Sequence, residues 1–240
     1  MFSSRTYLVS GASSGIGACL CDRLLSLNAK IVAVSRRQVS RPGMGLNWLP
    51  CDFSDSVQVS ALTSTLARDY PDINGVILCH GVGVFGSLEE FSESRIRALL
   101  DTNLTSSILV TRACLPNLKR RKSGDLVFVG SEAGLKGGKK GAVYSASKFA
   151  LRGLAQALRD ECASGGVRVT MVNPGMVDTP FFDQLDFTPG ESEDNVLTAD
   201  EVAQLIVTVL SMRPGVVIDE INLSPLKTII RTRRGRVVKK

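Results

Sequence analysis

Residues 10–17 decide the fold of this chain, and they read Ser10-Gly11-Ala12-Ser13-Ser14-Gly15-Ile16-Gly17. This stretch follows the apolar run Thr6–Ser10 and leads into an amphipathic segment, as a turn between a strand and a helix does. Its glycines permit a tight turn and let backbone amides approach an anion without an intervening Cβ. The start of the following helix adds unpaired N–H groups and a favourable dipole. Glycine triplets also occur in ordinary turns, so it is the position between a first strand and a first helix that predicts a cradle for a dinucleotide pyrophosphate.

Strand-like and helix-like segments alternate along the rest of the chain. The short apolar runs are Thr6–Ser10, Lys30–Ser35, Leu46–Cys51, Gly75–His80, Asp125–Gly130, Arg168–Asn173 and Glu220–Leu223. The helix-period segments are Gly15–Leu27, Val57–Tyr70, Glu93–Leu118, Ala142–Ala163 and Ala199–Met212. Most of the strand runs are continuously apolar, as parallel strands covered on both faces are. The pattern predicts one α/β domain over residues 1–226, a Rossmann-type doubly wound parallel sheet of about seven strands flanked by helices.

Two segments fall outside this alternation. Residues 178–197 combine three phenylalanines with six acidic residues and lack a clear secondary structure. We interpret this segment as a substrate loop that acts as a lid; a disordered surface loop is the alternative. Residues 227–240 form a basic C-terminal tail. Its basic residues are Lys227, Arg231, Arg233, Arg234, Arg236, Lys239 and Lys240, with no acid among them.

The tail accounts for the net charge of +6, because the remaining 22 basic and 23 acidic residues nearly cancel. A solvated, partly disordered tail is the simpler interpretation. The alternative is contact with an anionic lipid surface, an acidic partner or a phosphorylated substrate. Nucleic acid is the least supported partner, because the tail has no interleaved aromatic residues and the body has no basic excess.

Composition places the chain among ordinary cytoplasmic enzymes. Hydrophobic residues make up 44% and charged residues 22%, and no apolar run approaches the roughly 18 residues of a transmembrane helix. The first residues lack the anatomy of a signal peptide. The six cysteines are scattered without CxxC pairs, so we expect buried reduced thiols and no metal site.

The end of the second strand-like run indicates which nicotinamide cofactor is used. An acid there would bind the ribose 2′-OH of NAD, whereas this chain reads Ser35-Arg36-Arg37. Guanidinium groups bind a phosphate through paired hydrogen bonds, so these residues favour NADP(H). Two solvated surface arginines are the alternative. Asp52 follows the third strand-like run and is placed to meet the adenine edge, although an ordinary turn aspartate would also fit.

A second group of polar residues suggests acid–base chemistry. Tyr144 and Lys148 are four apart on a predicted helix and so share a face, and Ser131 follows the fifth strand-like run. A free tyrosine has a pKa near 10, and a neighbouring ammonium group with a positive nicotinamide ring would lower it. A YxxxK pair on a helix is common by chance, so the pair alone carries little weight.

The complete pattern resembles the short-chain dehydrogenase/reductase family. The matching residues, in order and at consistent spacing, are Gly11, Gly15, Gly17, Ser131, Tyr144, Lys148 and Asn173-Pro174-Gly175. Segments Ala142–Asp160 and Val169–Pro180 are also similar to that family's central helix and sixth-strand region. The resemblance covers essentially the whole chain. It implies an NADP(H)-dependent oxidoreductase that moves a hydride between a nicotinamide ring and a carbonyl or alcohol carbon of a small-molecule substrate.

The resemblance also implies a role for each matching residue. Tyr144 would be the general acid in reduction and the base in oxidation, with Lys148 on the nicotinamide ribose lowering its pKa. Ser131 would polarise the substrate carbonyl, and Asn103 would anchor a proton-relay water. Arg36 matches the basic position of NADP(H)-preferring members. The implied cofactor-binding residues are Gly11, Ser13, Ser14, Gly15, Ile16, Gly17, Ser35, Arg36, Arg37, Asp52, Gly81, Tyr144, Lys148, Pro174, Gly175, Val177 and Thr179, the last two toward the nicotinamide carboxamide.

One segment departs from the family pattern. Many members carry Asn-Asn-Ala-Gly after the fourth strand, and this chain reads Leu78-Cys79-His80-Gly81. Gly81 is retained, so the backbone can still pass close to the cofactor. The asparagine hydrogen bonds are lost. This loss bears on the stability of the segment and on its affinity for the cofactor. We expect His80, the only histidine, to be a buried, hydrogen-bonded ring beside the cofactor rather than a proton-transfer group.

Substrate and assembly are less well indicated. The ending Gly215–Pro225 is similar to the subgroup of short NADP-dependent reductases that includes 3-hydroxy acid and serine dehydrogenases, and a general carbonyl reductase is equally compatible. A 3-oxoacyl-acyl-carrier-protein reductase is an alternative, with Lys119–Lys122 or the tail meeting the acidic carrier. A non-catalytic NADP(H)-binding scaffold or sensor is a further alternative. The resemblance implies a homo-oligomer, a dimer or tetramer formed through the long helices.

Overall fold

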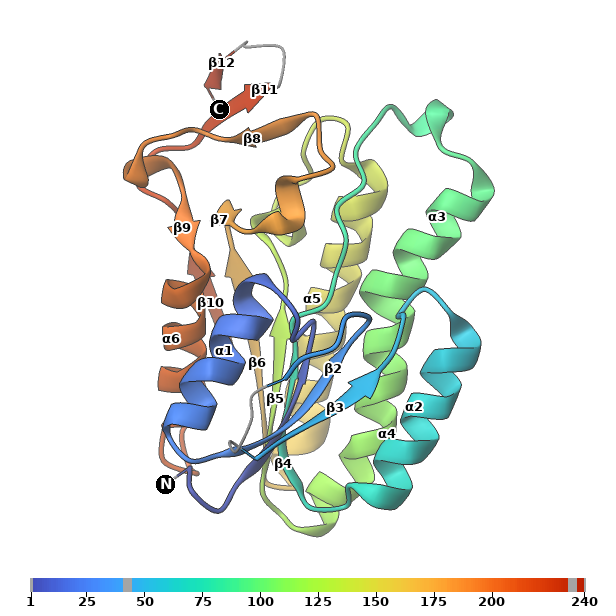
Figure 1. Cartoon of the computed structure of the whole chain (residues 1–240), viewed down its shortest axis with the longest axis vertical. Coiled ribbons are helices and arrows are strands. Elements are labelled where there is room, and N and C mark those ends of the chain that lie inside the picture. Colours follow the sequence, from blue (N-terminus) through green and yellow to red (C-terminus); the bar gives the residue numbers. More distant parts are fainter. Residues whose placement is uncertain (1, 41–44, 233–236, 240) are drawn as a thin grey trace.

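The central sheet carries seven parallel strands in the part of the chain that the computed structural model describes, residues 2–40, 45–232 and 237–239. The strands are β1 (Thr6–Ser10), β2 (Lys30–Ser35), β3 (Leu46–Pro50), β4 (Ile73–Leu78), β5 (Gly124–Val129), β6 (Val167–Pro174) and β10 (Glu220–Leu223). Their order across the sheet is β10-β6-β5-β4-β1-β2-β3 (Figure 1). The order reverses between β1 and β4, as in doubly wound dinucleotide-binding folds. The predicted fold is confirmed.

Helices cover both faces of the sheet (Figure 1). One face carries α1 (Gly15–Ser26) and α6 (Ala199–Leu210), and the other carries α2 (Ser56–Asp69), α4 (Ser106–Arg120) and α5 (Ala142–Ala163). Each face has its own core. Leu24 of α1 belongs to one cluster with Val9 of β1, and Leu118 of α4 belongs to the other with Phe128 of β5. The continuously apolar strands are therefore explained by burial on both sides.

The predicted helix Glu93–Leu118 is divided in the structure. It consists of α3 (Glu93–Leu100), a π turn η2 (Asp101–Thr105) and α4. A π turn widens the hydrogen-bonded ring by one residue and is frequent at functional sites. Here it carries Asn103, whose side chain hydrogen-bonds both backbone polar groups of Val82. The turn thus fixes the loop that follows β4.

The substrate loop contains short elements instead of one irregular stretch. They are β7 (Val177–Asp178), η4 (Pro180–Phe182), β8 (Phe187–Pro189), η5 (Glu193–Asn195) and β9 (Leu197–Thr198). Strand β8 pairs antiparallel with β11 (Ile229–Thr232), which pairs with β12 (Val237–Lys239). Residues 227–232 therefore pack on this loop and residues 237–239 pair with β11, which differs from the solvated, partly disordered tail suggested by the sequence. Residues 233–236 and 240 of the tail lie outside the described residues.

None of the helices in the described ranges is both long enough and apolar enough to span a bilayer.

Candidate active site

The glycine turn joins β1 to α1 in the geometry that the sequence predicts. Gly11 and Gly15 have φ angles of +66° and +55°, left-handed values that favour glycine. A Cβ on Gly17 would lie 2.5 Å from the carbonyl oxygen of Gly11, so the turn closes on the helix only without a side chain there. Ser14 is the N-cap of α1, and its side chain makes no capping hydrogen bond. Such an uncapped helix end beside a glycine turn fits a pyrophosphate. Ser13 and Ile16 lie in the same turn, and both are half-buried.

The segment after β6 closes the other side of this turn. The Cγ2 atom of Thr179 lies 3.0 Å from the position that a Cβ on Gly15 would take. Val177 is buried, and Pro174 and Gly175 mark the end of β6 and the residue after it. Residues 174–179 are therefore brought beside residues 11–17, as the resemblance implies.

The end of β2 shows two kinds of polar residue. Ser35 is buried, and its hydroxyl donates to the Arg37 carbonyl and accepts from the indole nitrogen of Trp48. The Arg36 guanidinium lies 3.8 Å from the Asp52 carboxylate with 71% of its side chain exposed. Asp52 also accepts two hydrogen bonds from the residue two positions further on, which is the turn role named as its alternative. Ser35 thus stabilises the loop after β2 through its buried hydrogen bonds, whereas the exposed Arg36 guanidinium is accessible to a phosphate.

The acid–base residues meet at the carboxyl ends of the central strands. Tyr144 and Lys148 lie one turn apart on α5, with the lysine Nζ 5.9 Å from the tyrosine ring centroid. The Ser131 side chain lies close enough to the Tyr144 phenol to lower the pKa of that phenol. A Cβ on Gly81 would lie 3.4 Å from both the Asn103 Oδ1 and the Lys148 Nζ. The structure therefore brings together the four residues proposed as catalytic, with Gly81 between two of them.

Asn103 uses its side chain as a structural tie. Its Oδ1 accepts from the Val82 amide at 2.8 Å, and its Nδ2 donates to the Val82 carbonyl and to the Ser147 hydroxyl. The side chain is 1% exposed. It holds the loop after β4 against α5.

Burial shifts the pKa values of both Tyr144 and Lys148. Burial raises the pKa of Tyr144 to about 12. The Ser131 side chain lowers this pKa, but by a smaller amount. Burial also lowers the pKa of Lys148 to about 8. The pKa of Tyr144 is therefore raised in this arrangement, because desolvation of the phenolate outweighs the opposing effect of Ser131.

The unusual segment after β4 builds its own hydrogen-bond network. The Nδ1 atom of His80 lies 2.6 Å from the Ser10 hydroxyl, and its Nε2 lies 2.9 Å from the Ser106 hydroxyl and 3.3 Å from that of Ser107. Phe53 stacks on the imidazole at 3.7 Å. Burial and the Lys148 charge lower the pKa of His80 to about 3, so the ring is neutral. The expected buried, hydrogen-bonded ring is confirmed.

Sequence reasoning missed the hydrophobic surroundings of Tyr144. Phe85 and Phe181 contact its ring, with centroids 5.1 Å and 6.0 Å away. Phe187 packs edge-on against Phe85 at 4.9 Å, and Phe182 contacts Phe181 and Phe187. The phenylalanines of the substrate loop were noticed in the sequence as a composition feature. No sequence pattern indicates that they pack close to Phe85, which lies about 100 residues away along the chain.

Comparisons with known proteins agree with this site. The family model described as short chain dehydrogenase matches residues 5–188. An uncharacterized oxidoreductase of Staphylococcus epidermidis is 28% identical over 230 residues, covering 91% of this chain and 96% of that protein. The human 17-beta-hydroxysteroid dehydrogenase type 1 is 34% identical over 203 residues, which cover 78% of this chain and 61% of the human protein.

Solved structures match the fold over almost the whole chain. A short chain dehydrogenase/reductase family protein superimposes with a TM-score of 0.84 at 24% identity, covering 93% of this chain and 97% of that one. A serine dehydrogenase from Escherichia coli superimposes with a TM-score of 0.77 at 25% identity, covering 91% and 96%. The family match spans both the glycine turn and the Ser131, Tyr144 and Lys148 site. The chain therefore belongs to the short chain dehydrogenase family and is an oxidoreductase that acts on alcohol and carbonyl groups.

Proposed function

We propose that the chain is an NADP(H)-dependent carbonyl reductase of broad type, with Asn103, Ser131, Tyr144 and Lys148 as its catalytic group. The observation that carries the proposal is the grouping of Tyr144 and Lys148 on one face of α5, with Ser131 beside the phenol, together with an uncapped helix end in a glycine turn. NADPH, when bound, supplies the hydride. The remaining roles belong to the chain's own residues.

Those roles are binding, orientation and proton transfer. The Ser131 hydroxyl holds the substrate oxygen beside the phenol, and Tyr144 donates its proton to that oxygen during reduction. Lys148 donates to the Val129 carbonyl at 3.2 Å and can also donate to the ribose. Its positive charge favours the phenolate left after proton transfer. Asn103 fixes the loop that bears Gly81, and thereby the floor of the nicotinamide site.

Exposed Arg36 beside Asp52 supports NADP(H) over NAD(H). Two structural neighbours are described with such a cofactor, a serine dehydrogenase complexed with NADP+ and an alcohol dehydrogenase from Thermococcus sibiricus complexed with 5-hydroxy-NADP. The Arg36→Asp variant is expected to weaken NADPH binding at least tenfold, because a phosphate partner is replaced by a like charge. Arg68→Asp, at an equally exposed arginine near the C-terminal end of α2, is the matched control. An unchanged NADPH to NADH preference in Arg36→Asp would place the 2′-phosphate elsewhere.

The direct test is a fluorescence titration of the purified protein with NADPH and with NADH, followed by absorbance at the nicotinamide band across a carbonyl panel. Tight NADPH binding with turnover of a ketone or aldehyde supports the proposal. Failure to bind either nucleotide would refute it. The panel should contain L-serine and 3-hydroxybutyrate with NADP+, because the fold is similar to serine dehydrogenases and a serine or 3-hydroxy acid substrate remains a candidate.

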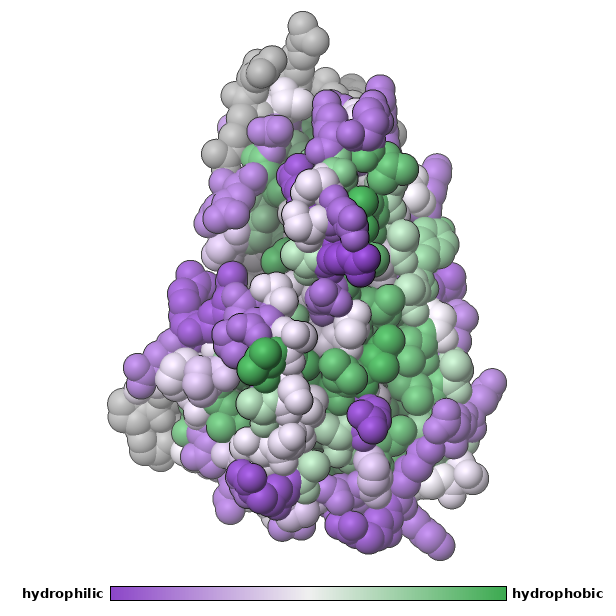
Figure 2. Space-filling view, turned by 90° about the vertical axis from the view of Figure 1, so that its right-hand side faces the viewer, coloured by the Kyte–Doolittle hydropathy of each residue, from purple (hydrophilic) through white to green (hydrophobic). Residues whose placement is uncertain are grey.

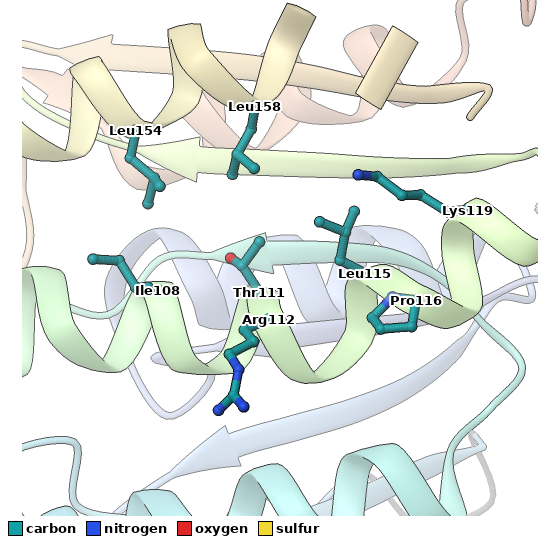
Figure 3. A pocket seen from close by; sticks show the side chains of 8 residues that line it. All are labelled: Ile108, Thr111, Arg112, Leu115, Pro116, Lys119, Leu154 and Leu158. Atoms are coloured by element: carbon teal, nitrogen blue, oxygen red, sulfur yellow. The ribbon is translucent and has the colours of Figure 1, made fainter. Parts of the chain in front are cut away.

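We further propose that the chain forms a homo-oligomer through α4 and α5. These helices border a groove lined mostly by aliphatic side chains (Figure 3). Its lining residues are Ile108, Thr111, Arg112, Leu115, Pro116, Lys119, Leu154 and Leu158. Ile108 and Phe149 are large exposed hydrophobics on these two helices, and the view in Figure 2 shows hydrophobic residues gathered over the middle of one side of the molecule.

Light scattering after size exclusion tests this assembly. Ile108→Glu is expected to convert a dimer or tetramer to a smaller species, and Leu27→Glu, at an exposed position at the end of α1, is the control. A monomeric wild-type chain would contradict the proposal. All six cysteines are thiols outside any disulfide, and four of them are buried, which supports our placement of the enzyme in the reducing cytoplasm.

A further inference from the structure

The catalytic tyrosine lies in a hydrophobic cluster of its own. Tyr144 is 6% exposed and groups with Val143 and Leu99, apart from the two cores that cover the faces of the sheet. Phe85 and Phe181 are among the residues packed against this group. The phenol therefore works in surroundings built largely from hydrocarbon, unlike an active site open to water.

Two of the phenylalanine rings, Phe85 and Phe181, pack directly against the backbone of glycine residues. A Cβ on Gly83 would lie 2.3 Å from the Cζ atom of Phe181, and one on Gly141 would lie 3.3 Å from the Cε1 atom of Phe85. A side chain at Gly83 would displace the Phe181 ring outright. The two rings thus lie against the main chain and both contact the Tyr144 ring, which makes their position a property of the fold.

The loop that carries Phe181, Phe182 and Phe187 is held in place by contacts with the C-terminal segment. Phe187 of β8 pairs with Thr232 of β11 in the antiparallel ladder. Two ion pairs between side chains add to this backbone pairing. Arg231 pairs with Glu191, and Lys227 pairs with Asp194 at 2.6 Å. Acidic side chains of the loop are therefore matched by cations of the C-terminal segment, while its phenylalanines face the tyrosine cluster.

We propose that the substrate is a bulky apolar ketone, or the matching secondary alcohol, whose hydrocarbon body lies among Phe85, Phe181 and Phe187. This inference rests on the proposed carbonyl reductase function and names its substrate class. Placing an apolar body against these rings removes hydrocarbon surface from water, which contributes about 25 cal/mol per Å². A charged carboxylate at the same place would lose its hydration among phenyl rings.

The reaction balances without a further reagent. In reduction, the carbonyl carbon gains a hydride from NADPH, and the carbonyl oxygen gains the proton of the Tyr144 hydroxyl. The products are the secondary alcohol, NADP+ and a tyrosinate that takes a proton from solvent. For the substrate to enter, the Phe181 ring must move away from Tyr144 and the Phe187 ring away from Phe85, so the loop opens before each turnover.

The test is a matched series of methyl ketones with NADPH, from 2-butanone to 2-octanone, beside 7-oxooctanoate, which has the chain length of 2-octanone and a terminal carboxylate. We expect kcat/KM to rise about fourfold for each added methylene, as burial of one methylene predicts. The oxo acid should be turned over at least tenfold more slowly than 2-octanone. Equal rates along the series, or preference for the oxo acid, would overturn the inference while leaving the reductase function intact.

Variants provide an independent measurement. Phe181→Ser and Phe187→Ser should each lower the ratio of kcat/KM for 2-octanone over 2-butanone by about fourfold or more, the effect of one methylene. The control Leu27→Ala, at the far end of α1 from the site, should keep the wild-type ratio. A ratio unchanged in both phenylalanine variants would contradict the assignment of these rings. NADPH binding without turnover of any ketone would instead count against the proposed function itself.

Discussion

His80 makes the stability of this fold depend on pH in a way that can be calculated. Its ring is buried between Ser10 and Ser106 and stacked on Phe53, and its pKa is lowered to about 3 by burial and by Lys148. A histidine in the unfolded chain has a pKa of about 6.5. Between these values the unfolded state binds more protons than the folded state, so stability rises with pH. The contribution is fully present above about pH 6.5 and is lost as the pH falls toward 3.

The magnitude follows from these two pKa values. At pH 5 the unfolded histidine is protonated and the folded one is neutral, so the folded state loses about 2 kcal/mol relative to pH 8. The variant His80→Gln cannot titrate in this range. At pH 8 it should be about 1–3 kcal/mol less stable than the wild type, because a stacked ring and a hydrogen bond are lost. At pH 5 that difference should shrink by about 2 kcal/mol.

Urea unfolding followed by circular dichroism at pH 8 and pH 5 measures both differences. Ile31→Val, a buried position on β2, is the control, because its cost of about 1 kcal/mol does not involve a titrating group. The carboxylates that titrate near pH 5 are common to all three proteins and cancel in the comparison. A stability gap between wild type and His80→Gln that is the same at both pH values would refute the buried neutral imidazole.

Two further substitutions test other parts of the structure. Gly17→Ala places a Cβ 2.5 Å from the Gly11 carbonyl oxygen, so the glycine turn must shift, and we expect NADPH to bind at least about tenfold more weakly by fluorescence titration. Wild-type affinity in this variant would mean that the turn is not the pyrophosphate cradle. Arg168→Met leaves the buried Asp125 carboxylate without the guanidinium that hydrogen-bonds it at 2.7 Å, and should cost about 3–5 kcal/mol in urea unfolding. Cofactor affinity should stay close to the wild-type value, since this pair lies at the other end of the strands; a loss below 1 kcal/mol in stability would contradict the burial argument.

Local patterns were sufficient to predict the sheet and the shared helix face of Tyr144 and Lys148. Continuously apolar runs separated by helix-period segments placed all seven strands, because burial on both faces leaves that signature. The spacing of Tyr144 and Lys148 was likewise visible, since a helix brings residues four apart to one face. Division of the helix at η2 was hidden, because the helical pattern continues through the π turn without a glycine or proline.

Contacts between distant segments were the part that sequence could not supply. His80 was expected to be hydrogen-bonded, but its partners Ser10 and Ser106 lie 70 and 26 residues away. The pairing of β8 with β11 joins two short strands about 40 residues apart, and neither has the length or alternation of a recognisable strand. The same holds for Phe85 and Phe187, whose contact decides the character of the substrate site.

The central claim is that Tyr144 transfers the proton in an NADP(H)-dependent reduction. The most direct measurement is the turnover rate of Tyr144→Phe with the best ketone of the series, together with its dissociation constant for NADPH. We predict that kcat falls by about 10²–10⁴-fold while the NADPH dissociation constant changes by less than about threefold, because the phenol acts in the chemical step. A variant that keeps the wild-type kcat would contradict the account.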